Sequence, residues 1–176
     1  MAIYFSDEAQ TRAAHIVNYA TLTYTTRRSL SNNGTNEMLL ADFGTYNKKE
    51  SGSILVFTGY CHGKNDANDF NTLRVKIGAS FDSSSFVVSG GTQNDNPSGG
   101  TYTYFNGNGS KLLMLHGQFT SYTTTGDSSI LATYRSSSNS GGGRPFALIN
   151  PDANDSNHLA TSMMGSRISI YEVLLW

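Results

Sequence analysis

The stretch Ser53-Ile-Leu-Val-Phe-Thr-Gly-Tyr-Cys-His62 decides the fold. Alternate residues of a β-strand point to opposite sides, and in this stretch both sides are largely apolar. One side carries Leu55, Phe57, Gly59 and Cys61, and the other carries Ile54, Val56, Thr58 and Tyr60. An edge strand would be more polar, so we predict a central strand.

Short apolar or alternating runs of this kind recur along the chain and are separated by clusters of Gly, Asn and Ser, which favour turns. Ser (23), Thr (18), Asn (16) and Gly (18) dominate the composition, whereas only 14% of the residues are charged. We therefore predict an all-β fold, a jelly-roll β-sandwich. The expected strands are Ala14–Tyr24, Met38–Phe43, Ser53–His62, Thr72–Ala79, Phe86–Ser89, Thr101–Phe105, Leu112–Tyr122, Ser129–Arg135, Arg144–Asn150 and Arg167–Leu175.

The length of 176 residues suits one domain with its own core. We divide the chain into an N-terminal arm, residues 1–13, and a jelly-roll domain, residues 14–176. Around the boundary, Glu8 to Ala14 is predicted to form one helical turn capped by Asp7.

The arm begins with an apolar triplet, Ile3, Tyr4 and Phe5, ahead of a polar segment. Apolar side chains at a chain terminus need a surface on which to pack. We expect the triplet either to dock on a partner protein or to add an edge strand to its own sandwich.

Charge and hydropathy limit the classes of partner. The net charge is −1, and the basic residues form no run beyond the pairs Arg27-Arg28 and Lys48-Lys49, so no nucleic-acid surface is predicted. No segment resembles a signal peptide or a membrane span, so we expect a product of the cytoplasm with no membrane partner. Cys61 is the single cysteine and is expected to be a buried thiol.

The last expected strand changes its apolar side part-way along. Ile168 and Ile170 share one side, but Tyr171, Val173 and Leu175 follow on the other. A strand that is apolar on both sides must touch a second layer, a bulge or another subunit. We predict that Tyr171, Val173 and Leu175 lie in a subunit interface.

Four short motifs, taken in order, resemble a domain that is common in virion proteins of tailed bacteriophages. They are Arg12-Ala-Ala-His-Ile-Val-Asn-Tyr19, Ser51-Gly-Ser-Ile-Leu-Val56, Ser129-Ile-Leu-Ala-Thr-Tyr-Arg135 and Ser166-Arg-Ile-Ser-Ile-Tyr-Glu-Val173. The resemblance covers Arg12 to Val173 and rests on the order of strand patterns, the terminal one matching best. It implies a jelly roll like the heads of the tumour-necrosis-factor and complement C1q families, which form trimers.

The implied function is that of a non-enzymatic structural protein on the surface of a virion, working as a homotrimer that is made in the host cytoplasm. Only about a dozen residues precede the first matching strand, so no fibre shaft is expected, and head decoration or cement stands beside a short fibre. The partners are then copies of the chain and a capsid, portal or tail protein. Ile3, Tyr4 and Phe5 would attach it to the particle.

A glycan-binding adhesin of a tail fibre is the alternative function. Sugar sites on β-sandwiches combine aromatic faces with polar loops. The expected glycan rim consists of Tyr102, Tyr104, Phe105, Asn106 and Asn108. A host surface glycan would then be a further partner.

Two short segments contain residue types that are typical of a catalytic site. Gly126-Asp127-Ser128 and Asp155-Ser-Asn-His158 resemble the nucleophile and base blocks of a lipase/esterase family. That family has an α/β fold with helices between the two blocks, whereas only 29 residues of expected strand and loop separate them here. Ser128 is expected in a hairpin turn and His158 in a polar loop, and no catalytic residue is predicted.

Metal and cofactor sites are not predicted either. Asp152, Asn154 and Ser156 begin like a calcium loop, but Asn157 replaces the glycine and Met163 replaces the bidentate glutamate. The acidic loop around Asp66 and Asp69 has no recognised ligand spacing. No cofactor is expected.

The predicted core can be tested by truncating its side chains. It consists of Leu55, Phe57, Leu73, Val75, Ile77, Leu131, Phe146, Leu148, Ile168 and Ile170. Because each deletion leaves a cavity, Phe57→Ala or Ile170→Ala should lower the free energy of unfolding by about 2–5 kcal/mol. Thermal melting measures this loss, and unchanged melting temperatures in both variants would contradict the strand assignment.

Overall fold

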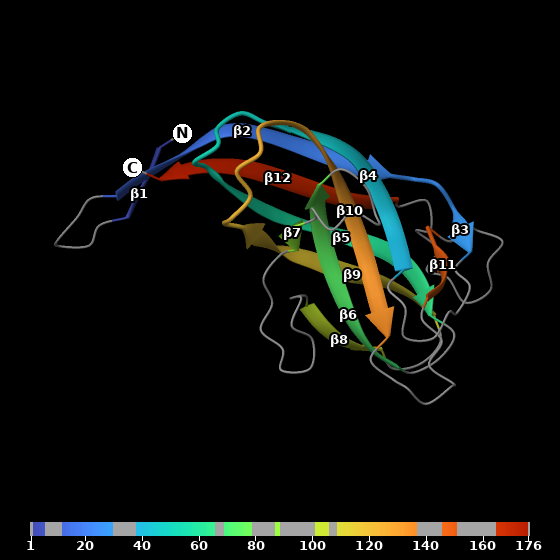
Figure 1. The fold of residues 1–176 in the computed structure, drawn as a ribbon. Helices are drawn as coiled ribbons and strands as arrows, with labels where there is room; N and C mark the ends of the chain where they lie inside the picture. Colours follow the sequence, from blue (N-terminus) through green and yellow to red (C-terminus); the bar gives the residue numbers. More distant parts are fainter. Residues whose placement is uncertain are drawn as a thin grey trace.

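The computed structural model describes residues 2–5, 12–29, 38–65, 69–78, 87–88, 101–105, 109–136, 146–150 and 165–175. Within these ranges the chain forms β-strands joined by turns (Figure 1). The same ranges contain no helix long and apolar enough to cross a membrane.

The first sheet contains the central strand that the sequence predicts. Its strands are antiparallel, and β5 (Ile54–Asn65) lies between β12 (Ser166–Leu175) and β9 (Gly109–Phe119). Beyond β12 follow β2 (Arg12–Tyr24) and then β1 (Ala2–Phe5). At the far end of β5 the short strand β11 (Phe146–Ile149) pairs with it and with β3 (Arg28–Ser29).

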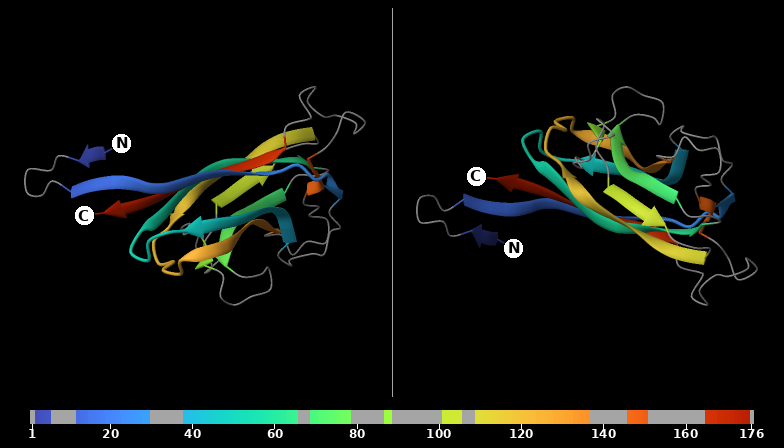
Figure 2. Two further views of the ribbon diagram at one scale, coloured as in Figure 1. Left: turned by 90° about the horizontal axis from the view of Figure 1, so that it is seen from above. Right: turned by 90° about the horizontal axis from the view of Figure 1, so that it is seen from below.

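The second sheet lies over the first. Its order is β4 (Met38–Lys48), β10 (Gly126–Ser136), β6 (Asp69–Gly78) and β7 (Val87–Val88), and β8 (Thr101–Phe105) also pairs with β6. The chain crosses between the sheets at β3 to β4, β4 to β5, β5 to β6, β8 to β9, β9 to β10 and β10 to β11, and the two layers are visible in Figure 2. This arrangement confirms the prediction of a jelly-roll β-sandwich.

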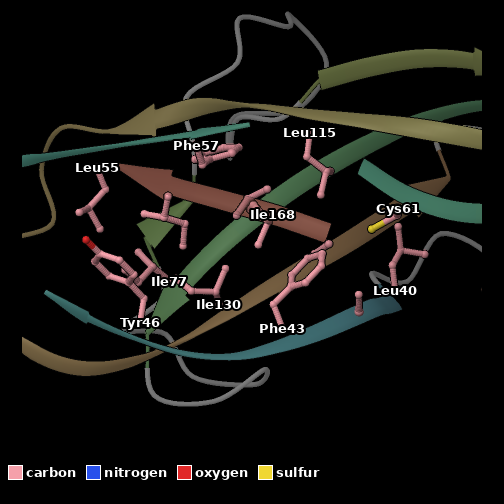
Figure 3. Packing of buried hydrophobic residues seen from close by; sticks show 14 of the residues in the cluster. Leu40, Phe43, Tyr46, Leu55, Phe57, Cys61, Ile77, Leu115, Ile130 and Ile168 are labelled. Atoms are coloured by element: carbon pink, nitrogen blue, oxygen red, sulfur yellow. The ribbon is translucent and has the colours of Figure 1, made fainter. Parts of the chain in front are cut away.

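The core fills the space between the two sheets (Figure 3). Phe57 and Phe119 pack there with ring centroids 5.2 Å apart. The expected core residues in this cluster are Leu55, Phe57, Val75, Ile77, Ile168 and Ile170. Leu131 is also buried, as expected, but its neighbours Ile130 and Ala132 are the residues of β10 that join this cluster. The side chains of Leu73, Phe146 and Leu148 are not among those described.

Several strands run further than the sequence indicates, and β4 is the clearest case. It continues past Phe43, where the expected strand ended, as far as Lys48. Gly44 has a φ of 86°, and its amide donates to Asp42 Oδ1 at 2.9 Å. A register shift against β10 accompanies this bulge, which interrupts the ladder without ending the strand.

Two further details differ from the sequence prediction. The prediction of a helical turn up to Ala14 is wrong for residues 12–14, because β2 begins at Arg12. Its antiparallel pairing with β1 holds this part of the backbone extended. The short strand β3 at Arg28–Ser29 was not expected, since two residues carry no readable alternation.

Gly59 allows the two central strands of the first sheet to approach closely. A Cβ atom at this position would lie 2.2 Å from the Arg167 carbonyl oxygen and 2.7 Å from the Ile168 Cα. Both atoms belong to the backbone of β12 and cannot move aside without disturbing the sheet. The site therefore requires glycine for space.

Asn150 joins four strands at one end of the sandwich. Its φ is 51°, a left-handed conformation that asparagine tolerates. The Asn150 amide donates to the His62 carbonyl at 2.8 Å, and the side-chain Nδ2 donates to the carbonyls of Tyr24 at 2.8 Å and Thr26 at 3.1 Å. Its Oδ1 accepts from the Ser166 amide and hydroxyl. These bonds hold the ends of β2, β5, β11 and β12 together.

Candidate functional site: the outer face of the first sheet

The last strand presents different chemistry on its two sides. Ile168, Ile170 and Glu172 are buried on the side that faces the second sheet. Tyr171, Val173 and Leu175 alternate with them and share the outer face. Leu175 is 53% exposed. The three residues of the expected interface are therefore brought together on a face that no described strand covers.

Tyr171 extends this face toward a neighbouring strand. It stacks on Tyr19 of β2 with ring centroids 5.6 Å apart and an interplanar angle of 23°. On its other side Tyr171 pairs with Val56 of β5. Tyr19 is 59% exposed, which is high for a side chain of this size. The result is an aromatic pair on the outer face, bordered by aliphatic residues, in which Tyr19 is exposed and Tyr171 is partly buried.

A polar row crosses the sheet next to this aromatic pair. Thr21 and Ser169 share a hydrogen bond of 2.9 Å between their hydroxyl groups. Ser169 pairs with Thr58, and Thr58 pairs with His116. The row contains no charged carboxylate or ammonium group, so it is compatible with burial against a polar surface of another protein.

A second apolar group lies beyond the polar row. Met114 and Leu112 of β9 are 56% and 45% exposed, and Tyr60 of β5 pairs with Met114. With Tyr19 and Leu175, these two residues are the large hydrophobic side chains that the described part of the chain exposes most. All four lie on strands of the first sheet. Exposed apolar groups gathered on one face mark an interaction surface.

A buried carboxylate lies beneath the expected interface. Glu172 is fully buried between Tyr171 and Val173. Its Oε1 accepts from the Glu50 amide at 2.6 Å and from the Ser53 hydroxyl at 2.7 Å. Its Oε2 accepts from the Lys49 amide at 2.9 Å and from the Tyr46 hydroxyl at 3.4 Å. Glu172 thus binds the turn between β4 and β5.

These contacts set the ionisation of the groups around the turn. Burial alone would raise the pKa of Glu172, but the donors on Lys49, Ser53 and Glu50 and the charge of Lys48 outweigh it and lower this pKa. Burial, reinforced by Glu172, raises the pKa of Tyr46. Lys48 is almost completely buried, and this burial lowers its pKa. The carboxylates of Glu172 and Glu50 act in the opposite direction but do not outweigh the burial. Glu172 and Lys48 are therefore buried groups of opposite charge. The carboxylate of Glu172 and the ammonium group of Lys48 are both hydrogen-bonded.

The structure also explains the apparent change of side in the last strand. The inner face does not end at Ile170 but continues to Glu172, which is the residue that sequence reasoning missed. A register shift against β2 between Glu172 and Val173 marks a bulge at the same point. The signal was present in the sequence, because Glu172 is an acid in the alternating position of two buried isoleucines.

The remaining candidate residues fall in other parts of the fold. Ile3, Tyr4 and Phe5 lie in β1, which pairs with Ala13, Ala14 and Arg12 of β2, and their side chains are not described. β1, residues 12–15 of β2 and residues 174–175 of β12 form a ribbon that extends beyond the second sheet (Figures 1 and 2). Tyr102, Tyr104 and Phe105 lie in β8 with side chains outside the described set, and Asn106 and Asn108 lie outside the described residues.

The residues of the esterase-like motif are engaged in structural contacts. Ser128 is buried in β10, not in a hairpin turn, and its hydroxyl shares a short hydrogen bond with the Tyr122 hydroxyl. Asp127 accepts from the Asn47 side chain at 2.6 Å. His158 and the calcium-like loop from Asp152 lie outside the described residues. Among the described residues, no group of three or more His, Cys, Asp or Glu side chains could hold a metal ion.

Comparisons with known proteins give no family for the chain. No protein-family model matches it, and no curated protein matches it. Solved structures of infectious bursal disease virus are similar to 96–97% of the chain: the Gt strain (11% identity, TM-score 0.38), the Gx strain (13%, 0.37) and the VP2 subviral particle (11%, 0.38). The chain spans 43–45% of those chains. Similarity at these values supports no conclusion about function.

The buried carboxylate predicts a pH-dependent stability. Glu172→Gln should lower the free energy of unfolding at pH 7 by about 3 kcal/mol, because it removes the charge that Lys48 and three close donors face. The pKa of Glu172 in the folded protein lies below its ordinary value of 4.5. The contribution of the charge is therefore complete above that value and disappears as the pH falls through the folded pKa.

Urea unfolding of the wild type and of Glu172→Gln at pH 7 and in acid measures this effect. The difference between the two proteins should close in acid. Glu50→Gln is the matched control, since its side chain is exposed on the same turn and its amide still donates to Glu172. A difference that stays constant with pH would contradict the role of the charge.

Proposed function

We propose that this chain is a non-enzymatic structural protein on the surface of a virus particle, a tailed bacteriophage, and that it works as a homotrimer. The outer face of the first sheet carries the self-association in this proposal. Tyr171, Val173 and Leu175 share this face with Tyr19, and Leu175 and Tyr19 are more than half exposed. Contact with other copies would remove this apolar surface from water.

The virion role rests on the resemblance to a domain of tailed-phage virion proteins. Its four motifs fall on β2, on the start of β5, on β10 and on β12. Three of these strands, β2, β12 and β5, are neighbours in the first sheet. The motifs of the resemblance therefore include the strands that form the proposed subunit interface. Head decoration and a short fibre are both compatible with this role.

A structural role also suits the described nucleophilic side chains. The hydroxyl of Ser128 is bound to Tyr122 within the buried part of the sandwich. Burial raises the pKa of the Cys61 thiol to about 12, so it stays protonated at neutral pH and is a poor nucleophile. Glu172 is saturated with hydrogen bonds from the turn between β4 and β5.

Attachment to the particle is proposed for the arm. β1 forms an edge strand on its own chain, and β2 is its single partner among the described strands. Its other edge can therefore pair with a strand of a capsid, portal or tail protein, with Ile3, Tyr4 and Phe5 in the contact. Three such arms in one trimer would strengthen the attachment through avidity.

Light scattering tests the trimer. The wild type should have three times the chain mass of 19.0 kDa, or a multiple of that trimer mass where trimers associate, at micromolar concentration. Val173→Asp places a charge in the proposed interface and should shift the mass toward the monomer with an unchanged circular-dichroism spectrum. Thr45→Asp, at an exposed position of β4 on the other sheet, is the control and should leave the mass unchanged. A folded monomeric wild type would overturn the trimer.

Removal of residues 2 to 12 tests the attachment. The shortened chain should fold and associate as before but should no longer join phage particles in a sedimentation assay, because β1 is absent. Normal assembly onto particles, or failure to fold, would contradict the role of the arm. Retention of the full-length chain on bacterial envelopes rather than on particles would favour the glycan-binding alternative.

A further inference from the structure

The strand β9 forms an open edge of the first sheet. Among the strands that the structure describes, β5 is its single partner. The register between the two strands runs from Leu55 opposite Phe119 to Asn65 opposite Gly109 without a shift. The backbone groups on the other side of β9 therefore form a long and regular row.

Open edges in folded proteins are normally protected against pairing by short length, bulges, proline or charge. The edge strand β4 carries two register shifts and the positive φ of Gly44, and the edge strand β1 has four residues. β9 has 11 residues and no proline, and it carries no charged residue from Leu112 to Phe119. β9 contains Gly117 at a φ of 157°, but this residue keeps its place in the register with β5, so β9 is the least protected of these edges.

The side chains beside this edge are those of an interface. Leu112 and Met114 are 45% and 56% exposed on the outer face. A strand added to β9 would cover parts of both side chains and would supply partners for the backbone groups of the open edge. The open edge therefore offers an extended strand both backbone hydrogen-bonding groups and an apolar surface.

We propose that β9 pairs in antiparallel orientation with β9 of a second copy of this chain, around a two-fold axis at Met114. Met114 is the midpoint of β9, so this register pairs all 11 residues of the strand. Leu112 then lies opposite His116 of the second copy, and Leu113 lies opposite Leu115. An axis perpendicular to the sheet keeps the two outer faces on the same side.

The distribution of charge suits a second copy of the chain. A two-fold axis brings identical residues together, and this is unfavourable where a strand is charged at its centre. The centre of β9 is uncharged, and Lys111 falls opposite Gly117 rather than opposite itself. The contact also closes between two copies, because each copy contributes the same edge, that of β9, and no β9 edge is left open.

Pairing of this kind would join two first sheets into one continuous sheet. The two outer faces would then form a single surface with both copies of Met114 at its middle. The residues Tyr171, Val173 and Leu175 take no part in it. The pairing is therefore independent of the proposed trimer, and in a trimer it would link one trimer to the next.

Cysteine cross-linking tests the register directly. In Met114→Cys the two new thiols lie opposite each other, with Cβ atoms about 4.5–5.5 Å apart, within reach of a disulfide after a small adjustment. The variant should form a disulfide-linked pair under mild oxidation. His116→Cys is the matched control on the same strand and face, and it should cross-link several-fold less because Leu112 lies opposite. The native Cys61 is buried and contributes no background.

The outcome of this experiment is decisive in both directions. Equal cross-linking of the two variants, or none in either, would overturn the proposed pairing. Hydrogen exchange of the wild type gives a second measurement that needs no substitution. The amides of residues 112–116 that point away from β5 should become more protected as the protein concentration rises, and unchanged protection across the association range would also overturn the proposal.

Discussion

The arrangement of the two sheets depends on the hydrogen bonds that the carboxylate of Glu172 accepts. Glu172 lies on a strand of the first sheet and binds the turn that leads from β4 of the second sheet to β5 of the first. A buried charge is tolerated only where donors surround it. The turn supplies amides and a hydroxyl for this purpose, and Lys48 supplies the opposite charge. The conformation of the turn and the position of the last strand are therefore fixed together.

This buried acid also determines what the outer face displays. Because the alternation of a strand is strict, an inward Glu172 places Tyr171 and Val173 outward. The same choice sets Tyr171 against Tyr19 in the stacked pair. The conformation of the interior and the composition of the exposed surface are thus linked through a single position. A substitution that disturbs the buried network around Glu172 would therefore also change the positions of Tyr171 and Val173 on the outer face of the sheet.

Much of the fold was predictable from alternation alone, because apolar periodicity and turn residues mark strands that pack against a core. The central position of β5 followed from its two apolar sides. The continuation of β4 past Gly44 did not, because the same residue can end a strand or form a bulge. The inward position of Glu172 is marked by its alternation with two isoleucines, but its partners are not, because two of the four donors are backbone amides, which have no signature in sequence. The pairing of Tyr19 with Tyr171 depends on the register of strands far apart in the chain, and local patterns do not encode it.

The neighbouring positions of β2 and β12 have a consequence for how the chain reaches its structure. The hydroxyl groups of Thr21 and Ser169 meet across 148 residues of sequence. β2 is therefore synthesised well before β12, and its edge stays uncovered until β12 has been made. Long loop closure of this kind slows folding and leaves strand edges open to wrong pairing in the meantime. Growth at lower temperature or the presence of a holding chaperone should therefore raise the yield of soluble protein.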